Sequence, residues 1–226
     1  MSQTQPPLCL LFDSDGTLVD SEPLLARAMA DTFPPFGLPF SAEQYMEEFR
    51  GVRFLDIVQE LERRFGSLAD DQRQIMEDRL RANMAERMQQ ELVPIAGIPQ
   101  ALDALADHPK AVASNGPIAK IRLAMETTGL APHFGDHLFS AYELGVWKPD
   151  PGLYLAAAEA MGVSPEHCVV IDDAAVGVEA GLKAGMQVIH INHFPEEEDT
   201  PEGAVGITHA DQLVDTIERL AAKATM

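Results

Sequence analysis

Short apolar runs alternate with helical patterns along most of this chain, and this alternation most constrains the fold. The strand-like runs span residues 8–13, 110–114, 137–140, 168–172 and 186–191. From residue 94 onward, the helical patterns span residues 97–106, 117–128, 151–161, 174–184 and 210–222. Strands that are apolar at nearly every position are typical of a parallel sheet covered by helices on both faces. Right-handed connections would then bring the C-terminal ends of all strands to one edge.

Residues 20–92 lack this alternation and are predicted to be helical throughout. Ser41-Ala42-Glu43-Gln44 is typical of a helix start, and Pro34-Pro35 and Gly66 are typical of breaks. We therefore predict an α/β core built from residues 1–19 and 93–226, with a small all-helical domain, residues 20–92, inserted after the first strand. The chain should hinge where it enters and leaves this insert.

Charge and length restrict the partners of this chain. It has 226 residues, with 36 acidic and 16 basic side chains and a formal net charge of −20. Such a charge argues against binding to nucleic acid or to anionic lipid. No stretch approaches the roughly 18 apolar residues of a membrane span, and we expect a cytoplasmic monomer. Cys9 and Cys168 are flanked by aliphatic residues in the strand-like runs and are expected to be buried reduced thiols.

The first apolar run ends in a group of acids, in the stretch CLLFDSDGTLVDSE at residues 9–22. Side chains alternate along a strand, so Asp13 and Asp15 should point to the same side. Gly16 allows the backbone to turn directly after them. A turn with capping side chains is the alternative interpretation of this stretch taken alone.

Polar side chains also follow later strand-like runs. They are Ser114, Asn115, Lys148, Asp172 and Asp173. Gly116-Pro117 would begin a helix with exposed N–H groups that suit an anion. Because strand ends share one edge, four carboxylates should meet there, and they cannot all stay ionised without a cation. Oxygen ligands favour Mg²⁺, and this combination of groups is typical of phosphoryl transfer.

Four motifs in this order resemble those of the haloacid dehalogenase superfamily. They are Phe12-Asp13-Ser14-Asp15-Gly16-Thr17-Leu18-Val19-Asp20-Ser21-Glu22, Ser114-Asn115, Lys148-Pro149 and Asp172-Asp173. The resemblance implies a Rossmann-like core with a helical cap domain after the first motif. The stretches FRGVRFLDI, ASNGP, VWKPDP and DDAAVGVEAGLKAGM resemble the sugar-phosphate phosphatase branch. This implies that the substrates are sugar or sugar-acid phosphates such as 6-phosphogluconate.

The resemblance also implies roles for individual residues. Asp13 would attack phosphorus to form an aspartyl-phosphate, and Asp15 would act as general acid and then general base. Phosphoryl oxygens would be held by Thr17, Ser114, Asn115 and Gly116. Lys148 would neutralise charge and restrain Asp13.

The same resemblance implies a Mg²⁺ site. Its ligands would be Asp13, the backbone carbonyl of Asp15, and the pair Asp172 and Asp173. Asp173 is favoured as a direct ligand, because it aligns with the metal aspartate of the family. Asp172 would bind either directly or through water.

The insert is expected to select the substrate. It contains nine arginines and no lysine between residues 19 and 93. Arg50 and Arg53 flank Gly51-Val52 and are candidates to bind a carboxylate or a second phosphate, because the guanidinium fork binds two oxygens at once. Glu22 is a further candidate for substrate contact. The other arginines are expected to form surface ion pairs.

Two other functions remain open at this stage. A hexose-phosphate mutase of the β-phosphoglucomutase type would need the same four motifs and would differ in how water is kept from the aspartyl-phosphate. A phospho-accepting signalling domain also uses clustered aspartates, Mg²⁺, threonine and lysine on a parallel sheet. It would need about half this length and no helical insert.

Overall fold

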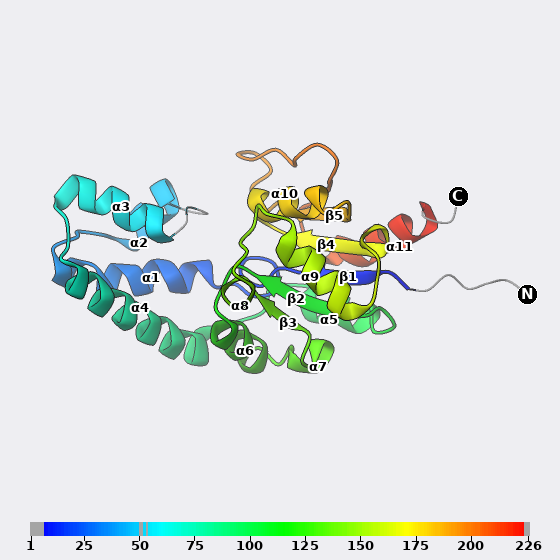
Figure 1. Cartoon of the computed structure of the whole chain (residues 1–226), viewed down its shortest axis with the longest axis horizontal. Coiled ribbons are helices and arrows are strands. Elements are labelled where there is room, and N and C mark those ends of the chain that lie inside the picture. Colours follow the sequence, from blue (N-terminus) through cyan, green and yellow to red (C-terminus); the bar gives the residue numbers. More distant parts are fainter. Residues whose placement is uncertain (1–6, 50–51, 53, 224–226) are drawn as a thin grey trace, which may run out of the picture. The chain divides into compact units, whose positions relative to one another are not determined.

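The computed structural model describes residues 7–49, 52 and 54–223. The chain forms two compact units, shown in Figure 1. One comprises Met1–Val19 together with Pro94–Met226, and the other comprises Asp20–Val93. We call them the core unit and the helical unit, and describe each by itself.

The core unit is built on a six-stranded parallel sheet. Its strands are β1 Cys9–Phe12, β2 Lys110–Ser114, β3 Leu138–Ser140, β4 Cys168–Asp172, β5 Gln187–Ile191 and β6 Val205–Ile207. Their order is β3-β2-β1-β4-β5-β6, and every neighbouring pair is parallel. The predicted fold class is therefore confirmed. The prediction missed β6, because three residues centred on Gly206 carry almost no strand pattern.

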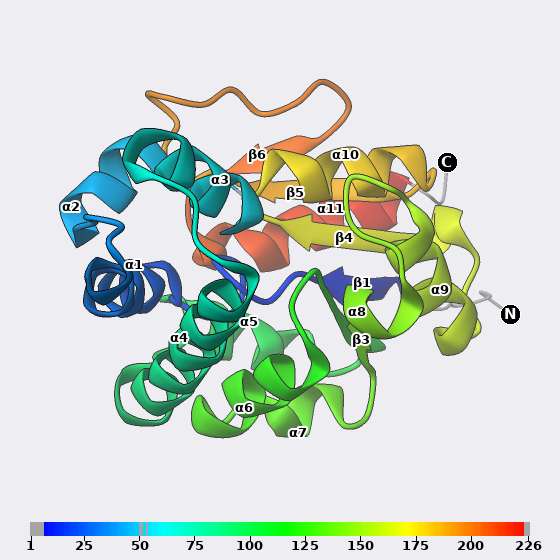
Figure 2. The ribbon, with the colours of Figure 1, turned by 60° about the vertical axis from the view of Figure 1, so that its left-hand side comes forward.

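Helices cover both faces of this sheet. They are α5 Ile98–Ala104, α6 Ile118–Thr127, α7 Ala131–Phe134, α8 Ala141–Leu144, α9 Gly152–Met161, α10 Ala175–Lys183 and α11 Leu213–Lys223, with short 3₁₀ turns η3 Pro165–His167 and η4 Ala210–Gln212. Helices α9 and α10 pack on one face and lie in front of the sheet in Figure 2, with α11 behind it.

Side chains alternate between the two faces along β1. Cys9 and Leu11 belong to a buried cluster that includes Tyr154 of α9. Phe12 points to the other side, where its ring meets that of Phe134 edge to face at 5.8 Å between centroids. With β1 buried on both faces, its C-terminal end is held in a fixed position at the centre of the sheet edge.

The helical unit contains the helices predicted for the insert. They are α1 Glu22–Thr32, the 3₁₀ turn η1 Pro34–Phe36, α2 Ala42–Gln44, the π-helical turn η2 Tyr45–Phe49, α3 Phe54–Phe65 and α4 Asp70–Glu91. Ser41 caps α2 as its sequence suggested, since its Oγ accepts a hydrogen bond from the Gln44 N–H at 3.1 Å. Across the described residues, no helix combines the length and apolar character needed to cross a membrane.

Most arginines of the helical unit are engaged in ion pairs with acids of the same unit, as expected. Those with such a pair are Arg27, Arg63, Arg64, Arg73, Arg81 and Arg87. Arg73, for example, lies 2.7 Å from a carboxylate oxygen of Glu62. Exposed ion pairs of this kind contribute little to stability, but they leave these arginines less suited to capture a ligand.

Candidate active site

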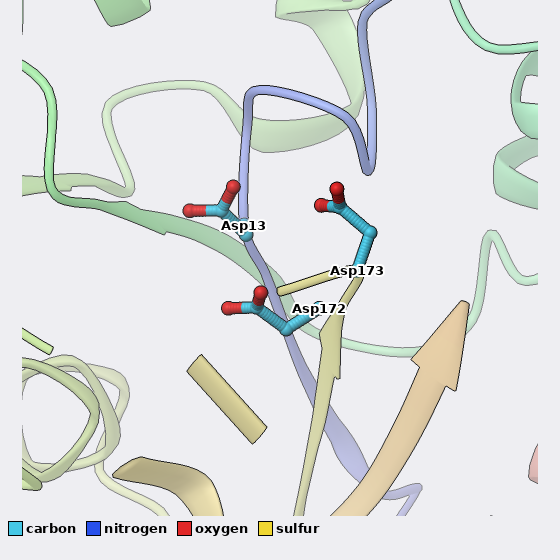
Figure 3. A group of neighbouring side chains, drawn as sticks. All are labelled: Asp13, Asp172 and Asp173. Atoms are coloured by element: carbon cyan, nitrogen blue, oxygen red, sulfur yellow. The ribbon is translucent and has the colours of Figure 1, made fainter. Parts of the chain in front are cut away.

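Three carboxylates gather where the two central strands of the core end. Asp13 follows β1, and its N–H donates to the carbonyl oxygen of Ile171 in β4 at 2.9 Å. Asp172 is the last residue of β4 and Asp173 follows it. One carboxylate oxygen from each of these three acids lies within 4.8 Å of the others. Figure 3 shows the three side chains at the ends of these neighbouring strands.

Lys148 joins two of these acids. Its Nζ donates to Asp13 Oδ1 at 2.6 Å and to Asp172 Oδ2 at 2.8 Å. The lysine side chain is 3% exposed, and the side chains of Asp13 and Asp172 are 13% and 1% exposed. Burial alone would lower the pKa of Lys148, but the charges of Asp13 and Asp172 outweigh it and raise that pKa. The lysine is therefore held as a cation against the strand ends.

Tyr154 completes the environment of Asp172. Its Oη donates to Asp172 Oδ2 at 2.6 Å, and the Ala174 N–H donates to Asp172 Oδ1 at 2.9 Å. The Lys148 Nζ also lies 4.8 Å from the centre of the Tyr154 ring. Burial, followed by the charge of Asp172, raises the pKa of Tyr154 well above its usual range, so the hydroxyl remains a donor. Both oxygens of Asp172 thus already accept hydrogen bonds.

The cluster has more negative charge than its lysine compensates. Burial is the main reason that the pKa of Asp13 is raised to about 7; the nearby charge of Lys148 opposes this rise, and Asp172 adds to it. Burial and the charges of Asp172 and Asp13 also raise the pKa of Asp173. A hard divalent cation fits this site, because the three carboxylates offer oxygen ligands that lie close together. Three neighbouring carboxylates also repel one another when they are ionised, and a bound cation would offset this repulsion.

Asp173 is oriented by the turn that follows β1. The buried Thr17 hydroxyl donates to Asp173 Oδ1 at 2.6 Å. Gly16 adopts a φ of +79°, and a Cβ at this position would lie 2.1 Å from Asp173 Oδ2. Only glycine therefore lets the turn pass so close to the carboxylate.

Two histidines hold the backbone of the same region. His193 Nε2 lies 2.7 Å from the carbonyl oxygen of Gly16, and His190 Nε2 lies 3.1 Å from that of Asp173. Since a carbonyl only accepts, both ring nitrogens must donate. Sequence patterns did not reveal these partners, because a contact such as that of His193 with Gly16, across 177 positions, leaves no local pattern.

The residues after β2 connect this strand end to Lys148. Asn115 Oδ1 accepts from the Lys148 N–H at 2.9 Å, and its Nδ2 donates to the Lys148 carbonyl at 3.4 Å. Ser114 is buried, and its Oγ accepts from the Gly116 N–H at 3.1 Å. Asn115 thus fixes the backbone that carries the buried lysine.

Asp15 has a different partner from Asp13. Its Oδ2 lies 2.7 Å from Nζ of Lys120, which belongs to the first turn of α6. Neither Lys120 nor Tyr154 was a candidate from the sequence. A lysine in the first turn of a helix opposes the helix dipole, so its position could have drawn attention to Lys120. Tyr154 matches an ordinary buried helix position and carried no such signal.

The remaining candidates lie in the stretch assigned to substrate selection. Arg50 and Arg53 lie outside the described residues. Glu22 is the first residue of α1, in the helical unit. The predicted substrate contacts of these three residues stay predictions.

A parallel α/β core with clustered acids and a buried lysine at its central strand ends is typical of an enzyme that binds an anionic substrate together with a cation. A family model described as "Hydrolase: haloacid dehalogenase-like hydrolase" matches residues 8–185. The chain belongs to the haloacid dehalogenase-like hydrolases.

Individual relatives agree with this assignment. The chain is 36% identical over 206 residues to a 6-phosphogluconate phosphatase of Escherichia coli, which covers 90% of this chain and 91% of that protein. It is 29% identical to hexitol phosphatase B of Escherichia coli, over 99% of this chain and 98% of that protein. A haloacid dehalogenase-like protein of unknown function from Agrobacterium tumefaciens superposes with a TM-score of 0.77 at 27% identity, covering 95% of this chain and 99% of that structure.

These matches confirm the predicted family and the predicted enzyme class, a phosphoric monoester hydrolase. The match to this family and the helical insertion between β1 and β2 leave a phospho-accepting signalling domain without support.

Proposed function

We propose that this protein is a Mg²⁺-dependent phosphatase that hydrolyses small sugar or sugar-acid phosphate monoesters, such as 6-phosphogluconate, through an aspartyl-phosphate on Asp13. The observation that carries this proposal is the buried unit in which Lys148 bridges Asp13 and Asp172, with Asp173 beside it. A carboxylate and a cation that are held in fixed positions favour attack on a phosphoryl group. A purely structural role would not need this arrangement.

Asp13 would act as the nucleophile. One of its oxygens bonds to Lys148 at 2.6 Å, which limits its rotation and leaves the carboxylate oriented by a fixed cation. As a bond forms between an Asp13 oxygen and phosphorus, the bond from phosphorus to the ester oxygen breaks. Asp15 donates a proton to that departing oxygen, so the alcohol leaves neutral.

Hydrolysis of the aspartyl-phosphate would use the same two acids. Asp15, now deprotonated, takes a proton from water while the water oxygen bonds to phosphorus. The bond between phosphorus and the Asp13 oxygen breaks, which releases phosphate and restores the carboxylate. Dividing the reaction in this way lowers the barrier of each displacement.

The metal would be held directly by Asp13, Asp173 and the backbone carbonyl of Asp15. Asp172 is proposed to support it through water, since Lys148 and Tyr154 both donate to its Oδ2 and the Ala174 N–H donates to its Oδ1. When bound, the ion supplies positive charge that offsets the negative charge of the phosphoryl oxygens. Asp173 would be kept in place for this purpose by Thr17.

The end of β2 would bind the phosphoryl oxygens. Ser114 Oγ accepts from the Gly116 N–H, so its own proton can be donated to substrate. The Asn115 N–H is proposed as a further donor. The Gly116 N–H and the Thr17 hydroxyl are also proposed to donate to a phosphoryl oxygen, and they would exchange Ser114 Oγ and Asp173 Oδ1 for it when the substrate binds. Lys148 would neutralise charge on the same group.

The substrate class is proposed from the relatives together with the sequence of the helical unit. Both phosphatases described above are named for phosphorylated sugar derivatives, one of them a sugar acid. Arg50 and Arg53 are proposed to bind the carboxylate of a sugar acid, with Glu22 contacting its hydroxyl groups.

Phosphate release from a panel of esters tests this function. The panel contains 6-phosphogluconate, hexose phosphates, 2-phosphoglycolate and nucleotides, each with Mg²⁺ and without any bisphosphate activator. We expect 6-phosphogluconate to give the highest kcat/KM, and the Arg50→Ala and Arg53→Ala variants to lose that preference. Conversion of a hexose 1-phosphate to its isomer without net phosphate release would instead identify a mutase.

A further inference from the structure

We propose that Lys120 is a positioning residue that holds Asp15 in place for proton transfer to and from the substrate. The inference rests on the proposed function, because Asp15 needs a defined orientation only if it acts as general acid and base. Lys120 lies outside the four motifs of the family resemblance.

The position of Lys120 in its helix is electrostatically unfavourable, and an acidic partner is needed to offset this. It is the third residue of α6, which spans Ile118–Thr127 and begins directly after Pro117. The N-terminal end of a helix carries partial positive charge, so a lysine in the first turn is disfavoured. The ion pair with Asp15, at 2.7 Å, offsets this cost. The helix thus presents a cation to an acid 105 positions earlier in the chain.

The contact fixes one particular oxygen of Asp15 beside the predicted phosphoryl-binding residues. Lys120 contacts Oδ2, and a Cβ built on Gly116 would lie 3.9 Å from that oxygen, 3.7 Å from Cδ of Lys120 and 3.5 Å from Oγ of Ser114. Asp15, Lys120, Ser114 and Gly116 therefore surround one point at the end of β2. An ester oxygen leaving a phosphoryl group bound there would meet Asp15 at short range.

Exposure explains why Asp15 needs such a partner. Its side chain is 31% exposed, whereas that of Asp13 is 13% exposed. A partly exposed carboxylate can populate several rotamers, and only some place its oxygen within reach of the leaving group. The buried Lys148 restrains the proposed nucleophile, Asp13. Lys120, whose side chain is 27% exposed, restrains Asp15, the proposed general acid and base.

Leaving-group dependence separates positioning of Asp15 from other roles. An alkoxide must be protonated as it departs, whereas p-nitrophenolate leaves without a proton. kcat/KM reports the steps up to the first irreversible one, here transfer of the phosphoryl group to Asp13.

The variants Lys120→Met and Lys120→Arg are compared with Arg122→Met. Arg122 lies in the same helix, with a 52% exposed side chain 3.9 Å from Asp136.

Three substrates with Mg²⁺ make the comparison: p-nitrophenyl phosphate, a neutral polyol phosphate and 6-phosphogluconate. For Lys120→Met we expect kcat/KM to fall about tenfold on both alkyl phosphates, a part of the 10²- to 10⁴-fold typical of general acid catalysis. The value for p-nitrophenyl phosphate should stay within about twofold of the wild type, since its leaving group needs no acid. Lys120→Arg should recover most of the loss, and Arg122→Met should resemble the wild type.

Each other pattern overturns the inference. Equal losses on all three substrates would mean that Lys120 binds the phosphoryl group. A loss confined to 6-phosphogluconate would mean that it binds the substrate carboxylate, and unchanged values would mean that it has no role. If the wild type releases phosphate from none of the substrates, the proposed function fails and the inference fails with it.

Discussion

Without divalent metal, Asp13 should make the core unit less stable as the pH rises from 5 to 7.5. Its pKa is raised from 3.8 to about 7, chiefly by burial. The folded protein therefore binds this proton more tightly than the unfolded chain. The stabilisation is fully present below pH 3.8 and is lost as the pH rises through about 7. Proton linkage converts these two pKa values into a loss of roughly 2 to 3 kcal/mol between pH 5 and 7.5.

Urea denaturation of the wild type and of Asp13→Asn in EDTA measures this loss. The chain has one tryptophan, Trp147, which lies in the core unit beside Tyr142, so its fluorescence reports on unfolding of that unit. Groups common to both proteins cancel in the difference, apart from Asp173, whose pKa is raised in part by the charge of Asp13. The stability of Asp13→Asn relative to the wild type should rise by roughly 2 to 3 kcal/mol over this interval.

Adding Mg²⁺ should reverse the trend for the wild type. A ligand at 100 times its Kd stabilises the folded state by about 2.7 kcal/mol. This effect should be larger at pH 7.5 than at pH 5, because protons compete with the ion for the carboxylates. The reasoning is refuted if the difference between the two proteins is independent of pH, or if Mg²⁺ stabilises both equally at both pH values.

Three substitutions test other contacts of the site. Lys148→Met should destabilise the core by about 3 to 5 kcal/mol in EDTA, because it leaves buried carboxylates unpaired; a loss below 1 kcal/mol by urea denaturation would contradict this. Tyr154→Phe removes a hydrogen bond to charged Asp172 and should cost roughly 1.5 to 3 kcal/mol, and unchanged stability would show that the bond contributes nothing. Gly16→Ala should strain the backbone by about 1 to 2 kcal/mol and displace Asp173. Calorimetric titration of this variant should then show weaker Mg²⁺ binding. Wild-type affinity would argue against Asp173 as a ligand of the ion.

The sequence predicted the strand ends well for a simple physical reason. The C-terminal ends of parallel strands share one edge of the sheet, so the sequence alone places Asp13 and Asp172 together although they are far apart in the chain. The cap of α2 at Ser41 was predictable because it depends on residues three apart.

Contacts between distant side chains on different elements could not be predicted in this way. The pairing of Lys120 with Asp15 depends on how α6 packs beside the turn after β1, and local patterns do not encode this. Tyr154 reaches Asp172 because α9 crosses the sheet next to β1, which is again a matter of packing. The helix predicted over residues 210–222 instead begins as a 3₁₀ turn, with α11 starting at Leu213, because helix boundaries depend on caps more than on periodicity.

The central claim is that Asp13 carries the phosphoryl group during turnover. Acid quenching of the enzyme while it turns over 6-phosphogluconate with Mg²⁺, followed by peptide mass spectrometry, locates any phosphoryl group directly. We predict a phosphorylated peptide with the modification on Asp13, absent from Asp13→Asn, which should remain folded and inactive. A phosphoryl group on another residue, or full activity of Asp13→Asn after deamidation has been ruled out by mass, would contradict the account.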